Sequence, residues 1–350
     1  MPNLFELPPA LLIFWTAAVF ILGAAIGSFL NVVILRTPLK ESIVVNRSHC
    51  MSCGRQLRNI DLIPILSYIF LRGKCRFCKA RISPRYWIVE LLTALMYVLS
   101  LYTLGLSVEL VYALVLIPVL IALSGIDIDT MNIPYWASMI IVALGLISIF
   151  TGDMPWQEHL LGMACVGVPF ALLAMFGAMG GGDVQIMAAA GLLLGWKIVP
   201  AAGIGIVLGA VGGSISLLRV PKTQKKEVNE RLNQIASEWY AQQSEDGCLV
   251  QNGKSDVLYG SFFRGKSDIE PDCINEKLWS KKPDIAALNE KLNDGLSGFD
   301  QYNLSVVLEG DRVKSVSAKK QIVFGPYLAV GIAVGFLFGQ EIIDWYLGLL

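Results

Sequence analysis

Charged residues are scarce in this chain of 350 residues. They make up 16% of it and hydrophobic residues 55%, which excludes an ordinary soluble domain, where about a quarter of the residues are charged. Roughly 20 apolar residues cross a bilayer core, so we predict an all-α polytopic membrane protein with seven to eight transmembrane helices. The uncharged runs are residues 7–35, 91–108, 110–126, 130–152, 160–182, 184–196, 198–218 and 322–340.

A positively charged start is also missing. The first apolar run is longer than the core of a secretory signal, and its only early charge is Glu6, so we expect no cleaved signal peptide. We see neither a nucleotide-binding loop nor an internal repeat, and we expect the bilayer, not a nucleic acid, as a partner.

Positive charge is concentrated in one loop, although the formal net charge of the chain is zero. Between Arg36 and Arg85 there are eleven Lys or Arg residues against two acids, Glu41 and Asp61. The positive-inside rule places this loop in the cytoplasm, and the N-terminus is then outside. Two spans lead out and back to Asp127, and two more lead to Asp183. We therefore expect both acids at the cytoplasmic boundary.

The composition divides the chain into five regions. We expect a first transmembrane helix at 1–35, a cysteine-bearing cytoplasmic loop at 36–84 and a membrane core at 85–219. A polar cytoplasmic insert follows at 220–320, and a last transmembrane helix at 321–350. The insert carries 15 basic and 16 acidic residues. It has helix-like stretches at 225–243 and 283–296 and strand-like pieces at 305–308 and 312–317, which predict a small α/β or partly ordered domain.

Four cysteines in the basic loop have the spacing of metal ligands. They form two Cys-x-x-Cys pairs, a pattern that offers four thiolates to a structural zinc ion in a zinc-ribbon-like fold. A disulfide pair or a redox role is the alternative, but a reducing cytoplasm opposes disulfides. His49 is adjacent but is not needed, because four cysteines fill the coordination shell. The ligands we predict are Cys50, Cys53, Cys75 and Cys78.

Two acids at the edges of uncharged runs are the candidate catalytic residues. Asp127 ends one run, and Asp183 closes the sequence Gly180-Gly181-Gly182-Asp183. Taken singly, Asp127 and its neighbour Asp129 could be helix-end residues, and Asp183 could cap the next helix. Placed together at one boundary, two carboxylates can share a proton and activate water for hydrolysis.

These segments resemble the family of type IV prepilin leader peptidases that are also N-methyltransferases. The resemblance rests on residues 27–34, the cysteine loop with 61–68, residues 82–92, Asp127 with Ile133-Pro134, residues 180–191 and residues 324–329. Within Asp127-Ile128-Asp129, the family pattern selects Asp127, with Asp129 as the fallback, and it pairs Asp127 with Asp183 as the catalytic aspartates.

The resemblance also implies substrates and a cofactor. It implies cleavage of type IV prepilins or pseudopilins after Gly at the cytoplasmic face of the bacterial inner membrane. It further implies methylation of the new N-terminal residue, usually Phe, with S-adenosylmethionine as donor. The donor site stays unassigned; Glu90 and the basic loop are candidates, and Glu90 could equally be a helix-boundary residue. Oligomeric state is not predicted.

The chain departs from the family pattern at three places, and two other functions compete with it. Tyr135 stands where Asp or Asn is usual, Gln185 stands where Lys is usual, and residues 220–320 interrupt a link that is normally short. A transporter could use the two acids along an ion path. A non-enzymatic scaffold could use the cysteine loop and the insert to hold partners.

Overall fold

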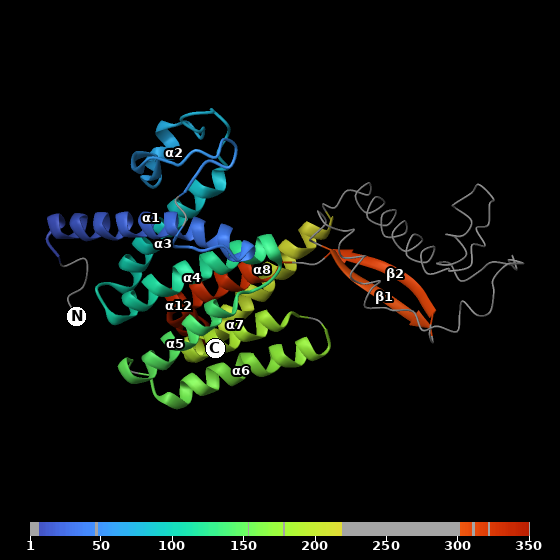
Figure 1. The fold of residues 1–350 in the computed structure, drawn as a ribbon. Helices are drawn as coiled ribbons and strands as arrows, with labels where there is room; N and C mark the ends of the chain where they lie inside the picture. The colour runs from blue at the N-terminus through green and yellow to red at the C-terminus, as the bar shows by residue number, and fades with distance from the viewer. Residues whose placement is uncertain are drawn as a thin grey trace, which may run out of the picture. The chain divides into compact units, whose positions relative to one another are not determined.

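The structure is a computed structural model that describes residues 7–45, 48–152, 154–177, 179–218, 302–309, 312–320 and 323–349. The chain divides into two compact units, Met1–Gly212 with Val323–Leu350, and Gly213–Ile322. The first unit contains the apolar helices and the cysteine loop (Figure 1). Of the second unit, the structure describes the end of one helix and two strands.

The first unit is built from long apolar helices, as the uncharged runs predicted. Six runs are long and apolar enough to cross a membrane, and a shorter apolar helix joins them. One of the six, 35 residues long, contains two helices separated by a turn, so the described chain holds eight apolar helices. They are α1 (Pro9–Leu39), α3 (Pro84–Leu104), α4 (Val108–Thr130), α5 (Tyr135–Thr151), α6 (Trp156–Met175), α7 (Gly181–Leu194), α8 (Ile198–Leu218) and α12 (Gly325–Leu347).

The run at 184–196 is short for a bilayer core, which predicts a span that is thin, tilted or merged with its neighbour. In the structure it lies with its neighbour in one apolar stretch of 35 residues, which a turn divides. At 1.5 Å per residue, a 35-residue helix would be about 52 Å long, well beyond a bilayer core. The break falls at the 3-10 turn η3 (Gly195–Lys197), where Gly195 has φ +55° and ψ −132°. Glycine adopts this backbone conformation without a side-chain clash, so the chain can leave α7 and enter α8 within three residues.

Helix α12 packs antiparallel against α8, although about a hundred residues separate them in sequence. Gly331 lies against Ala201 and Gly205, whereas Gly339, further along α12, lies against Lys197 at the start of α8. The small residues let the two helices approach closely, as is common in membrane bundles. The start of α12 is thereby held near the end of α8.

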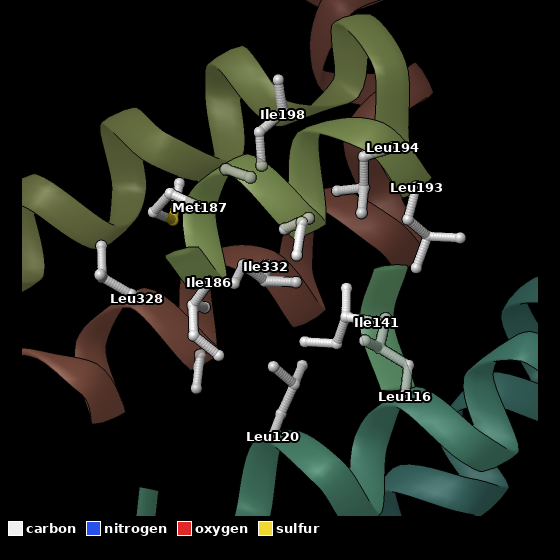
Figure 2. Close-up of a cluster of buried hydrophobic side chains, with 14 of the residues drawn as sticks. Leu116, Leu120, Ile141, Ile186, Met187, Leu193, Leu194, Ile198, Leu328 and Ile332 are labelled. Carbon is white, nitrogen blue, oxygen red and sulfur yellow. The ribbon is translucent and has the colours of Figure 1, made fainter. Parts of the chain in front are cut away.

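A large apolar core joins α4, α5, α7, α8 and α12 (Figure 2). Leu116 and Leu120 of α4 face Ile141 of α5, while Ile186 of α7 and Ile332 of α12 close the cluster. All five side chains are at most 3% exposed. This core matters for function because it fixes the end of α4 relative to the start of α7, where the two candidate aspartates lie.

The cysteine loop connects α1 to α3 and contains two short helices, η2 (Asn59–Leu62) and α2 (Leu66–Phe70). It projects from the start of α3 (Figure 1). Helices α1 and α3 pack along each other, and Asn31 of α1 donates to the carbonyl of Tyr86 at 3.0 Å.

Two strands come from the polar insert. β1 (Tyr302–Glu309) and β2 (Arg312–Lys320) pair antiparallel, with a register shift between Val307 and Leu308. The strand-like pieces at 305–308 and 312–317 are thus confirmed as strands. The helix-like stretches at 225–243 and 283–296 lie outside the described residues.

Candidate active site and metal centre

Asp127 lies in the last turn of α4 and is buried, with 5% of its surface exposed. The helix stops just beyond it because Met131 takes a left-handed conformation, with φ 52°, and donates its N–H to the Asp127 carbonyl at 2.8 Å. The carboxylate has its own donor. The main-chain N–H of Gly325, the first residue of α12, lies 2.9 Å from Asp127 Oδ2.

Asp183 lies in the first turn of α7 and is half-buried. Its Oδ2 accepts a hydrogen bond from the N–H of Gly180 at 3.3 Å. Gly180, not Asp183, is the N-cap of α7, so the reading of Asp183 as the N-cap was wrong: it caps the helix from the third helical position instead. The capping contact leaves the other carboxylate oxygen of Asp183 available, so capping and chemistry are compatible here.

The two acids meet at one end of the apolar core. Ile133, which follows Asp127 in the link to α5, packs directly on Gly182, the residue before Asp183; a Cβ at position 182 would lie 2.9 Å from Ile133 Cβ. The two carboxyl groups are near enough to interact electrostatically. The fold therefore brings together two acids that stand 56 residues apart in the chain.

Asp129 has a different environment from Asp127. Its side chain is about one-third exposed and accepts from the Arg85 guanidinium at 2.7 Å. Arg85 also donates to the carbonyl of Gly125 at 2.9 Å. The pair joins the start of α3 to the last turn of α4. Sequence reasoning missed this role of Arg85; its place directly after Pro84, at the end of the basic loop, was the only available signal.

The four predicted cysteines form one cluster. Their sulfur atoms all lie within 4.8 Å of one another, and Cys50 Sγ is 3.8 Å from Cys78 Sγ. Four thiolates at about 2.3 Å from a tetrahedral zinc ion would be about 3.8 Å apart. The cluster has the composition and spacing to hold a metal ion, and the geometry fits zinc.

The two Cys-x-x-Cys pairs have the same backbone geometry. Cys50 N–H donates to the Arg55 carbonyl at 2.9 Å, and Cys75 N–H donates to the Ala80 carbonyl at 2.8 Å. In each pair the residue four positions after the first cysteine has positive φ, 68° at Gly54 and 59° at Lys79. Two equivalent turns therefore present their sulfurs to a common centre, as in a zinc ribbon. His49 forms a backbone bridge with Gln56 and is not one of the four ligands.

Two of the four thiols, Cys50 and Cys78, have shifted pKa values when no cation is bound. Backbone hydrogen bonds from Ser52 and Cys53 lower the pKa of Cys50 to about 6. At Cys78 the backbone hydrogen bond of Ala80 acts in the same direction, but desolvation and the other three cysteines outweigh it and raise the pKa to about 11. The Cys50 thiolate therefore forms readily, and the other cysteines oppose the ionisation of Cys78. A divalent cation removes that opposition, which is a further reason why this donor set suits a metal.

Polar contacts tie the cysteine loop to itself and to the helices. Asp61 of η2, whose side chain is 1% exposed, accepts from Arg76 of the second Cys-x-x-Cys pair at 2.7 Å. Arg55 and Arg58 lie over the ring of Phe77, with guanidinium carbons 5.2 and 5.5 Å from its centroid. These contacts hold the two halves of the loop together.

Glu90 of α3 is buried and already has partners. Its Oε2 accepts the N–H of Ile65 at 2.7 Å, and its carboxylate also interacts with the Ser28 side chain of α1. Ile65 has φ 63° and ψ −53°, a strained conformation for a β-branched residue. The geometry favours a structural role for Glu90, in which it stabilises the turn at Ile65, over a role in binding the methyl donor.

Known proteins match most of the membrane region. Residues 21–104 match the family described as Bacterial Peptidase A24 N-terminal domain, and residues 114–215 match the Type IV leader peptidase family. A prepilin leader peptidase/N-methyltransferase of Myxococcus xanthus is 37% identical over 60% of this chain and 65% of its own length. Those of Bacillus subtilis and Aeromonas salmonicida are 37% and 34% identical, over 85% and 84% of their lengths. No solved structure matches significantly. The chain belongs to the Type IV leader peptidase family and is a multi-pass membrane enzyme, whose relatives are named for peptidase and N-methyltransferase activities together.

Proposed function

We propose that this protein cleaves the leader of type IV prepilins or pseudopilins and that Asp127 and Asp183 carry out the hydrolysis. The observation that supports this best is the convergence of the two acids at one end of the helix bundle, through the contact of Ile133 with Gly182. Its relatives are named as prepilin leader peptidases, and cleavage after Gly is what the resemblance implies.

One aspartate acts as a general base and the other as a general acid. Two adjacent carboxylates do not both ionise, so one retains its proton. The ionised partner takes a proton from a water molecule, whose oxygen attacks the scissile carbonyl carbon. The protonated partner donates its proton to the carbonyl oxygen as that oxygen gains charge. When the C–N bond breaks, the leaving nitrogen takes the proton that the first carboxylate removed from water and departs as the amine. The tetrahedral diol returns a proton to the second carboxylate as it becomes the carboxylic acid, so the pair again holds one proton.

The site faces the cytoplasm in this proposal. Arg85, the last residue of the basic loop, contacts the final turn of α4, two residues from Asp127. Because loops rich in Lys and Arg stay on the cytoplasmic side, the acids that share this end of the bundle lie at the inner face of the bacterial cytoplasmic membrane. The cleaved bond of a prepilin would have to reach that face.

We propose that the cysteine cluster holds a structural zinc ion through Cys50, Cys53, Cys75 and Cys78. A closed site of four cysteines has no open coordination position. The ion would therefore stabilise the loop rather than react with substrate.

The second activity is methylation of the newly exposed amino group. S-adenosylmethionine, when bound, supplies an electrophilic methyl group for an unprotonated amine. We assign the methyl donor to no side chains among the residues that the structure describes.

Replacement of each acid by its amide tests the peptidase proposal. A model prepilin is incubated with the purified enzyme in detergent, and mass spectrometry reports the position of the cut and any added methyl group. Asp127→Asn and Asp183→Asn should each lower cleavage by about 10²–10⁴-fold, with normal protein accumulation. Asp344→Asn is the matched control, because Asp344 is an exposed acid on α12 that pairs with Gln340.

Three outcomes would contradict the proposal. Cleavage at the wild-type rate by both acid variants would remove the aspartates from the mechanism. A wild-type enzyme that leaves the peptide uncut over hours, while still binding it, would favour the scaffold. Ion flux in reconstituted vesicles that Asp183→Asn abolishes would favour the transporter.

A further inference from the structure

Asp127 has a hydrogen-bond partner that is distant in sequence. The N–H of Gly325 lies 2.9 Å from Asp127 Oδ2, in a buried contact between residues 198 positions apart. Gly325 is the first residue of α12, and an N–H in the first turn of a helix has no acceptor within that helix. This donor is therefore free to serve the carboxylate.

The donor matters because the position of Asp127 disfavours negative charge. Asp127 is buried and lies in the last turn of α4, where the terminal carbonyl groups of the helix point toward solvent and repel an anion. A hydrogen bond to the charged form of a buried carboxylate offsets part of that cost. Among the described residues, the contact from Gly325 is the direct hydrogen bond to the Asp127 side chain.

The contact also requires that residue 325 has no side chain. A Cβ on Gly325 would lie 2.5 Å from Asp127 Oδ2 and 3.0 Å from its Cγ, which real structures do not tolerate. The start of α12 cannot simply move away, because Phe324 and Tyr327 pack on Gly209 and Gly212 of α8. The packing of α12 on α8 therefore fixes both the position of the Gly325 N–H and the space that the Asp127 carboxylate occupies.

We propose that Gly325 is a positioning residue of the peptidase site: its main-chain N–H orients Asp127 and stabilises the carboxylate, and its missing side chain gives that carboxylate its place. The proposal rests on the proposed peptidase function. It assigns the last transmembrane helix, which follows the polar insert in sequence, a part in the chemistry.

Within the part of the chain that the structure describes, few charged groups lie around Asp127, so the effect of this hydrogen bond can be isolated. Asp183 faces it from α7. Asp129 and Arg85 lie beyond it on α4 and α3 and pair with each other. The atoms nearest to a Cβ at position 325 belong to Asp127, not to Asp129 or Arg85.

The first test is Gly325→Ala, compared with two controls. We expect kcat to fall about 100-fold or more, with KM within about twofold, because the carboxylate is displaced. Gly335→Ala introduces a clash elsewhere on α12, against the Ala201 side chain, and Gly203→Ala introduces a methyl where nothing lies within 4 Å. Both controls should keep the wild-type pH profile of kcat/KM. A Gly325→Ala enzyme as active as wild type would overturn the proposal.

The second test removes the N–H without adding bulk. Replacing residue 325 by glycolic acid converts the main-chain amide to an ester, so a variant that fails to fold through overpacking is avoided. A hydrogen bond to a charged group contributes about 1.5–3 kcal/mol, so we expect kcat/KM near neutral pH to fall about 10- to 100-fold. We also expect the acidic limb of the pH profile to move about one unit or more toward higher pH.

The two proposals fail in different ways. If the ester leaves both kcat/KM and the acidic limb unchanged while Asp127→Asn is inactive, the role of Gly325 is wrong and the peptidase assignment stands. If Asp127→Asn is fully active, the peptidase assignment itself is wrong.

Discussion

Arg85 and Asp129 form an ion pair at 2.7 Å that connects the end of the cysteine loop to the last turn of α4. Because Arg85 also holds the carbonyl of Gly125, it contacts the turn that carries Asp127 on either side of that residue. Asp129 is therefore partly exposed and paired with Arg85. Asp127 is buried, accepts a hydrogen bond from Gly325 of α12 and lies near Asp183 of α7.

Asp129→Asn should leave peptide cleavage within about fivefold of wild type. A partly exposed ion pair contributes only about 0–1 kcal/mol to stability, and an Asn side chain can still accept from Arg85. The measurement is kcat/KM on a model prepilin beside Asp127→Asn, which should lower cleavage about 10²–10⁴-fold. If Asp129→Asn lost as much activity as Asp127→Asn, Asp129 would again be a candidate for the catalytic aspartate.

Zinc should bind at about one ion per chain, and loss of the cysteines should remove it. Metal analysis of purified Cys50→Ser/Cys75→Ser is expected to show no zinc, with reduced accumulation, because a site of this kind contributes directly to folding. Cys165→Ser is the control, since Cys165 lies on α6 outside the cluster. A metal-free enzyme that keeps the folded loop, measured by limited proteolysis, would contradict a structural role.

Glu90→Gln and Glu90→Ala should differ. An amide oxygen can still accept the Ile65 N–H, so Glu90→Gln is expected to keep cleavage and methylation. Glu90→Ala leaves a buried N–H unpaired beside a strained turn and should cost about 1–3 kcal/mol of unfolding free energy, measured by denaturation in detergent. Loss of methylation alone in Glu90→Gln, with cleavage intact, would place Glu90 at the methyl-donor site.

Gly191→Ala should destabilise the contact between α6 and α7. A Cβ at Gly191 would lie 2.5 Å from the carbonyl oxygen of Gly162, and main-chain atoms cannot turn aside as a side chain can. We expect a loss of about 1–3 kcal/mol, read as a lower Tm in detergent. Gly203→Ala on α8, where a methyl meets nothing within 4 Å, should leave Tm unchanged.

The metal ligands were predictable because the spacing of Cys50, Cys53, Cys75 and Cys78 is local and repeated. Two identical turns can be recognised without knowing what surrounds them. The partners of Asp61 and Glu90 were not predictable in the same way. Arg76 is one of eleven basic residues in that loop, and nothing in their order says which one is within 2.7 Å of a buried acid.

The membrane helices follow from the sequence because hydrocarbon leaves the backbone few choices. A long apolar run without charge must satisfy its own hydrogen bonds, and a helix does so within the segment. The run at 184–196 was the exception, because its length allowed a thin helix, a tilted helix or one merged with its neighbour. In the structure the run shares one apolar stretch with its neighbour, and Gly195, with its positive φ, lies at the turn that divides this stretch into α7 and α8.

The order of residues thus determined the class of protein, the number of apolar helices, the cysteine cluster and the end of the bundle at which acids could gather. The tertiary structure alone decided that Asp127 is buried while Asp129 pairs with Arg85, and that Gly325 reaches Asp127 across 198 positions. The reason is physical. Periodicity and spacing encode contacts along one helix, whereas contacts between helices depend on which small residues let distant backbones meet.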